Sequence, residues 1–279
     1  MGQFEAECLM FDIGKYKGIT IADSVVSSIM KDKPMVIQVE KNDWGEAAVE
    51  DIQSLLENVR DQLLRHFSDP PSGRVIVHYT PDTPVNELRK SPQDDHSIWL
   101  CVKNRLWAQF SYQFAHEFCH VLCGTNEKQY QKPNQWFHEV ISELASIFAL
   151  KQMAVNWPEN PPYVGWSNYA QNLDEYANKI IDSVKKPSDG LNDWLGVYEP
   201  TLRDDPYQKN WNPERELNKI VAVELFPLFQ KAPHHWQSVA DMPSTPGSFE
   251  TYLTKWHQQC PAGHKSFVRQ IACIFGVSL

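Results

Sequence analysis

Three short segments near the start of the chain concentrate β-branched and other apolar residues in the manner of strands. They cover residues 35–40, 74–79 and 97–102, and proline or glycine borders the first two. Between the first two, residues 46–67 carry apolar side chains at helical spacing, and the Pro- and Gly-containing stretch 69–73 ends that helix. The first hundred residues therefore predict a mixed α and β region.

Helical periodicity dominates after residue 104. We expect helices over 105–123, 135–153, 168–184, 213–231 and 248–258, and again over 265–275. Prolines punctuate the intervening loops, and Asn212-Pro213 has the cap and first-turn proline of a helix start. The pattern predicts an α+β chain whose second half is mainly helical.

Composition narrows the class of protein. Hydrophobic residues make up 42% and charged residues 22%, as in ordinary globular proteins. The net charge of −9 gives no electrostatic footprint for nucleic acid, and the apolar runs are far shorter than the roughly 20 residues that span a bilayer. The N-terminus does not resemble a secretory signal, and 6 cysteines are too few for a disulfide scaffold. We therefore expect a cytoplasmic protein with free thiols that binds neither nucleic acid nor membranes.

Residues 116–120 read His-Glu-Phe-Cys-His, the HExxH pattern. On a helix, His116 and His120 project from one face and can hold one metal ion. Glu117 lies about 100° around the axis, where its carboxylate can act as a general base on the metal's water without ligating. An apolar stripe on the opposite side of this helix consists of Trp107, Phe110, Phe114, Phe118 and Val121.

A catalytic zinc site needs a third protein ligand. A histidine six residues after His120 is excluded because position 126 is Asn, and Cys101 lacks a matching local motif. Glu139 and Glu143 remain, four residues apart on the polar side of the predicted helix 135–153. Without the HExxH pattern, these two residues would suggest acids on the surface of a helix. Because HExxH precedes them, we expect Glu139 to bind the metal and Glu143 to accept a hydrogen bond from an imidazole N–H.

HExxH followed, after eighteen residues, by glutamate resembles the pattern of gluzincin metallopeptidases such as the M1 aminopeptidases. The segment 136–139 is similar to the aromatic-rich sequence before their glutamate ligand, and the Glu139–Glu143 pair is similar to a thermolysin-type Glu-xxx-Asp pair. This resemblance implies an α+β fold with a zincin-like core, in which a small mixed sheet accompanies metal-binding helices. It also implies one Zn²⁺ per chain on His116, His120 and Glu139, with Glu117 as general base and Glu143 supporting a histidine.

The expected activity is hydrolysis of peptide or protein substrates. We expect an N-terminal α/β region over 1–104, zinc-binding helices over 105–160 and a helical C-terminal region over 161–279. Within the first region, 97–102 is expected to be an edge strand to which substrate adds as a further strand.

Several points stay open at this stage. We expect Cys119 and Cys123 to be small helix residues packed beneath the cleft. Other possible functions are a non-catalytic, zinc-stabilised binding or regulatory protein and a metal hydrolase acting on a non-peptide amide. The candidates for the residue that stabilises an oxyanion are Tyr163, Tyr169, Tyr198, Tyr207, His234, His235 and His264.

Overall fold

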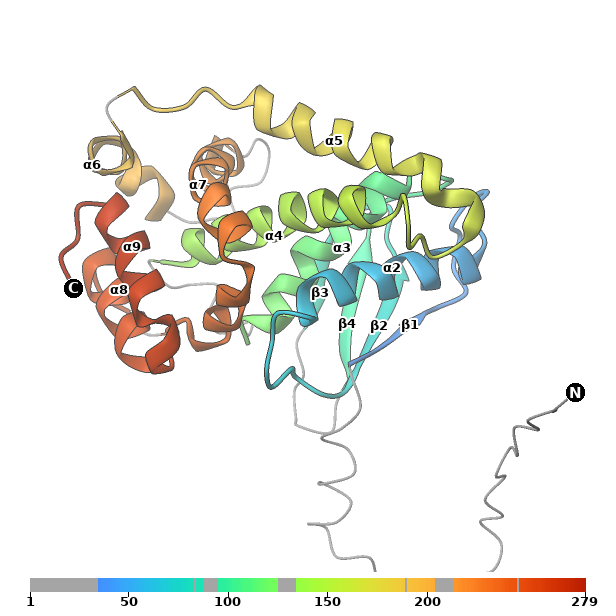
Figure 1. The fold of residues 1–279 in the computed structure, drawn as a ribbon, viewed down its shortest axis with the longest axis horizontal. Helices are drawn as coiled ribbons and strands as arrows, with labels where there is room; N and C mark the ends of the chain where they lie inside the picture. Colours follow the sequence, from blue (N-terminus) through green and yellow to red (C-terminus); the bar gives the residue numbers. More distant parts are fainter. Residues whose placement is uncertain are drawn as a thin grey trace, which may run out of the picture. The chain divides into compact units, whose positions relative to one another are not determined.

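Alternating apolar residues build a small mixed sheet at the beginning of the fold (Figure 1). Its strands are β1 (Val36–Val39), β2 (Arg74–Tyr79), β3 (Val85–Glu87) and β4 (His96–Leu100). The strand order is β1-β2-β4-β3, in which β1, β2 and β4 are parallel and β3 is antiparallel to β4. This computed structural model describes residues 35–82, 84–87, 95–124, 134–188, 190–203, 213–244 and 246–279.

The helices follow the predicted order closely. The α-helices are α2 (Val49–Leu64), α3 (Trp107–Leu122), α4 (Gln135–Asn156), α5 (Ala170–Ser183), α6 (Gly190–Arg203), α7 (Pro213–Lys231), α8 (Phe249–Gln259) and α9 (Lys265–Ile274). Short 3₁₀ helices are η3 (Val164–Tyr169), η4 (Pro233–Asp241) and η5 (Ala262–His264). The predicted α+β class, with a mixed sheet and a mainly helical second half, is confirmed. Helix α6 was not predicted, because Pro200 within it suggested a loop.

One face of the sheet is buried under helices α2 and α3. Val39, Val77 and Ile98 lie side by side on adjacent strands and are all buried. The outer edge of β1 is satisfied by the amide of Gln53 on α2. Its Oε1 accepts from the Val39 N–H at 2.9 Å, and its Nε2 donates to the Ile37 carbonyl at 2.7 Å. This edge of the sheet is therefore occupied by a side chain of the same fold.

The expected strand within 97–102 is present as β4, but its expected place at the edge of the sheet is wrong. Strand β4 pairs with β2 on one side and with β3 on the other, and Trp99 is matched with Val85. The edge strand next to β4 is β3, whose 3 residues are too few to produce a recognisable hydrophobic alternation.

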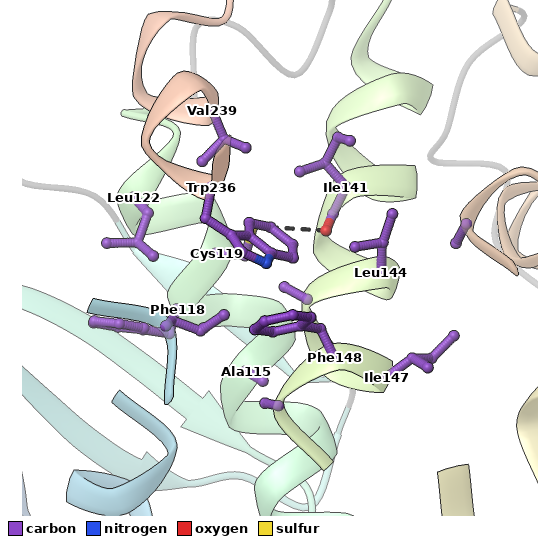
Figure 2. Close-up of a cluster of buried hydrophobic side chains, with 14 of the residues drawn as sticks. Ala115, Phe118, Cys119, Leu122, Ile141, Leu144, Ile147, Phe148, Trp236 and Val239 are labelled. Carbon is purple, nitrogen blue, oxygen red and sulfur yellow. Dashed lines mark hydrogen bonds between the residues drawn. The ribbon is translucent and has the colours of Figure 1, made fainter. Parts of the chain in front are cut away.

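Helix α4 lies at the centre of the helical part, in contact with α2, α3, α5 and α7 (Figure 1). Figure 2 shows Trp236 of η4 next to Cys119 of α3 and Ile141 of α4, and its ring also contacts that of Phe148. Residues 34–279 form one compact unit, so the regions predicted as 105–160 and 161–279 pack on each other. None of the helices in the described ranges is both long enough and apolar enough to cross a membrane.

Candidate metal centre

Helix α3 is anchored to the sheet by a side-chain amide. The Cys101 N–H, just beyond β4, donates to Gln113 Oε1 at 3.0 Å, and Gln113 Nε2 donates to the Cys101 carbonyl at 3.2 Å. The predicted apolar stripe of α3 is buried, which turns the histidine face of the helix toward α4. The stripe contains Trp107, Phe110, Phe114, Phe118 and Val121.

Three predicted ligands converge between α3 and α4. Nε2 of His116 lies 3.2 Å from Oε2 of Glu139, and Nε2 of His120 lies 3.4 Å from Oε1 of the same carboxylate. The three residues can each offer one ligand atom within 4.8 Å of the others. Within the described ranges, this is the one group of three or more such side chains that could hold a metal ion.

These separations fit a small divalent ion. Ligands about 2.0–2.1 Å from a tetrahedral zinc lie roughly 3.4 Å apart, close to the 3.2 and 3.4 Å found here. The donor set of two imidazoles and one carboxylate is also one that catalytic zinc sites use. The residues therefore fit a zinc ion, although other divalent transition metals accept the same donors.

Comparisons with protein-family models, with curated proteins and with solved structures find no match for this chain. The chemistry of the site is therefore inferred from its own residues.

The charges of His120 and Glu139 depend on each other. Burial disfavours the charged form of His120, but the Glu139 carboxylate outweighs this effect and raises the pKa of His120 to about 9. Burial likewise opposes ionisation of Glu139, yet the two histidines hold its pKa well below the ordinary value. The Glu139 carboxylate and the His120 imidazole thus favour each other's charged forms, and a metal ion bound at these atoms would take the place of a proton.

Glu143 lies beside His116, but the predicted hydrogen bond between them is not formed in this structure. Its Oε2 is 3.8 Å from Nδ1 of His116, beyond hydrogen-bond distance, and its side chain is only 2% exposed. Its Oε1 accepts a hydrogen bond from the hydroxyl of Tyr112. The sequence analysis assigned no role to Tyr112. The signal that could have pointed to it is its position one turn before His116, on the same side of the helix.

Glu117 is positioned by the same helix turn as the ligands. It is 7% exposed, and its charge contributes to the raised pKa of His120. Its charge therefore acts on the His–Glu cluster, and its expected role as a general base stays a prediction.

Cys119 and Cys123, expected as small buried helix residues, and His138 surround the cluster. Cys119 and Cys123 are buried, with their sulfur atoms 4.0 Å apart, and Cys119 Sγ lies 3.7 Å from the Ile141 carbonyl oxygen (Figure 2). His138 is directed away from the cluster, and its Nε2 lies 3.0 Å from the Tyr252 hydroxyl. These side chains therefore fix the surroundings of the ligands.

The candidates for oxyanion stabilisation are engaged elsewhere in the described part of the chain. The Tyr163 hydroxyl lies 2.8 Å from that of Ser54, and the Tyr169 hydroxyl accepts a hydrogen bond from the Ala108 N–H at 3.4 Å. The Tyr198 ring contacts Trp194. The His234 ring contacts that of His235, whose Nδ1 lies 2.9 Å from Nδ1 of His264. Tyr207 lies outside the described residues. The structure thus brings the three ligands, Glu117 and Glu143 together, and it does not bring these tyrosines and histidines to them.

Proposed function

We propose that this chain is a cytoplasmic, zinc-dependent metallopeptidase of the gluzincin type, with a zincin-like core. One observation carries the proposal: the ligand atoms of His116 and His120 on α3 and of Glu139 on α4 converge to within 4.8 Å, and Glu117 directly follows His116 on α3. Three protein ligands leave coordination open for water or substrate, as catalytic zinc sites do and closed structural sites do not.

The chemistry follows from the residues around the cluster. When bound, zinc supplies Lewis acidity, which polarises a carbonyl group and makes water more acidic. Glu117 accepts a proton from the attacking water and later transfers it to the leaving amine. Proton transfer by a positioned carboxylate accelerates such reactions by roughly 10²- to 10⁴-fold. Glu143 orients His116, so that Nε2 remains directed toward the ion.

An extended peptide is the substrate that this sheet is suited to bind. Strand β3 is antiparallel to β4 and packs near α3, and in the described part of the sheet no strand pairs with its other edge. A peptide that adds to β3 would use backbone hydrogen bonds and run past the histidine helix. The substrate-binding role expected for 97–102 therefore moves to β3 in this proposal.

Metal content and turnover of the purified full chain test the proposal directly. We expect close to one zinc per chain by elemental analysis and cleavage within a mixed peptide library, followed by mass spectrometry. Glu117→Gln should keep the zinc and lower turnover by roughly 10²-fold or more, because the proton acceptor is lost. Glu159→Gln, which alters an exposed carboxylate after α4, is the matched control and should behave like wild type.

Each contrary outcome points to a different conclusion. A chain that binds no zinc contradicts the metal site itself. Zinc binding without cleavage of any peptide favours a zinc-stabilised binding or regulatory protein, and cleavage restricted to non-peptide amides favours the other hydrolase class. Full turnover of Glu117→Gln removes Glu117 as the base.

A further inference from the structure

The polar residues that join α3 to α4 behind the metal ligands form a buried row. This row, called the polar seam below, consists of Tyr112 and His116 on α3 and Glu143 and Ser146 on α4. Tyr112 is 6% exposed, Glu143 1% and Ser146 0%. Buried polar groups are costly unless they have partners, so the contacts within the seam determine its geometry.

The two oxygens of Glu143 have different neighbours. Oε1 accepts from the Tyr112 hydroxyl, whereas Oε2 is 3.8 Å from Nδ1 of His116. A carboxylate can rotate about its terminal torsion, which has a broad energy minimum. The phenol restricts that rotation, because it occupies one oxygen and leaves the other directed toward the imidazole.

The helix backbone beside Tyr112 is held independently of its phenol. Ser146 Oγ donates to the Tyr112 carbonyl at 2.9 Å, one turn before His116. The position of α3 relative to α4 therefore has its own hydrogen bond within the seam. The phenol contributes something that this bond does not, namely the orientation of the Glu143 carboxylate.

We propose that Tyr112 is a positioning residue of the metal centre, which acts through Glu143 on His116. Its hydroxyl holds Glu143 with Oε2 facing the buried Nδ1 of His116 at 3.8 Å, and that nitrogen has no hydrogen-bond partner among the described residues. From this position the carboxylate can accept the Nδ1–H when a metal binds, and this tautomer leaves Nε2 for the metal. A carboxylate acceptor at the far nitrogen also makes the imidazole a stronger ligand. This inference rests on the proposed function, since it requires a metal at His116.

Zinc affinity of single variants of the full chain separates this role from a merely structural one. Tyr112→Phe should weaken zinc binding about tenfold in a competition with a chelator. This is the smallest loss typical of residues that support a metal ligand without binding the metal. Ser146→Ala removes the neighbouring helix–helix hydrogen bond and leaves the phenol–carboxylate contact, and Tyr169→Phe removes a hydroxyl that contacts only the start of α3. Both should bind zinc as wild type does.

Coupling and spectroscopy provide two further readouts. The double variant Tyr112→Phe/Glu143→Gln should bind zinc no more weakly than Glu143→Gln alone, because the phenol acts through that carboxylate. In the zinc-loaded chain, the Nδ1–H proton of His116 should give a downfield NMR resonance that shifts upfield in Tyr112→Phe and stays in place in Ser146→Ala.

The outcomes distinguish this inference from the proposed function. A wild-type chain that binds no zinc overturns both. Zinc binding by wild type and Tyr112→Phe with equal affinity and an unchanged resonance overturns the positioning role alone, as does equal weakening by Ser146→Ala. If Tyr112→Phe does not fold, 3-fluorotyrosine incorporated at position 112 keeps the shape and strengthens the donor. An unshifted His116 resonance then overturns the inference.

Discussion

At the scale of single residues, the same atoms can serve as an ion pair or as a chelate. His120 and Glu139 stabilise each other's charged forms when no metal is present. The positions of the ligands were predictable, because helical spacing alone puts His116 and His120 on one face. The contact of Tyr112 with Glu143 was not, because it depends on how closely α3 approaches α4. Spacing along one helix carries no information about that distance.

Alanine substitutions should separate the ligand from its support. Glu139→Ala removes a direct zinc ligand. It should weaken zinc binding by more than about 100-fold, which is the largest loss typical of residues that only support a ligand. Glu143→Ala should weaken it by about 10- to 100-fold, because it loses only the orientation of His116. Glu159→Ala, at an exposed position, serves as the control, and isothermal titration measures all three. The reverse order for the first two variants would mean that Glu143 is the ligand.

At the scale of elements, α4 departs most from its predicted character. Its apolar residues suggested a helix with one buried and one polar side, yet Ser142, Glu143 and Ser146 are buried as well. The reason is that other helices, among them α2, α3, α5 and α7, surround α4, so that its polar side faces α3 and not solvent. Periodicity identifies the apolar side of a helix, but it does not count the neighbours that cover the rest. For a similar reason β3 escaped prediction, since 3 residues show no period.

Deleting the Phe148 ring should show how strongly the α4 core is packed. Phe148 is 0% exposed, and its ring centre lies 5.2 Å from that of Trp236 (Figure 2). Phe148→Ala should lower the free energy of unfolding by about 3–5 kcal/mol, because the lost transfer energy is joined by that of a cavity. Val197→Ala, at a side chain that is 68% exposed on α6, should change it little. Urea unfolding measures both, and a loss below about 1 kcal/mol for Phe148→Ala would show that the core collapses around the gap.

At the scale of the whole molecule, the α/β part and the helical part are joined where α2 ends. The Ser68 N–H donates to Oε1 of Gln237 in η4 at 2.7 Å, and the His66 ring meets the edge of Phe148 from α4. The order of elements along the chain predicted the two parts correctly. It could not predict this junction, because the contact between Ser68 and Gln237 spans 169 residues and involves a 3₁₀ helix without apolar periodicity.

The junction should also make the fold sensitive to acid, because it encloses an imidazole. Burial, together with the positive charges of Arg65 and His234, lowers the pKa of His66 to about 4. The unfolded chain takes up a proton near pH 6.5, so between pH 6.5 and 4 it binds more protons than the folded chain, and stability falls as pH falls. His66→Phe keeps an aromatic ring against Phe148 and removes the titrating group. Between pH 7 and 5, wild type should therefore lose about 1 kcal/mol more unfolding free energy than this variant, since solvent screening reduces the effect of a half-buried group. Urea unfolding at the two pH values measures both chains, and an equal loss in His66→Phe would show that His66 is not the source of the pH dependence.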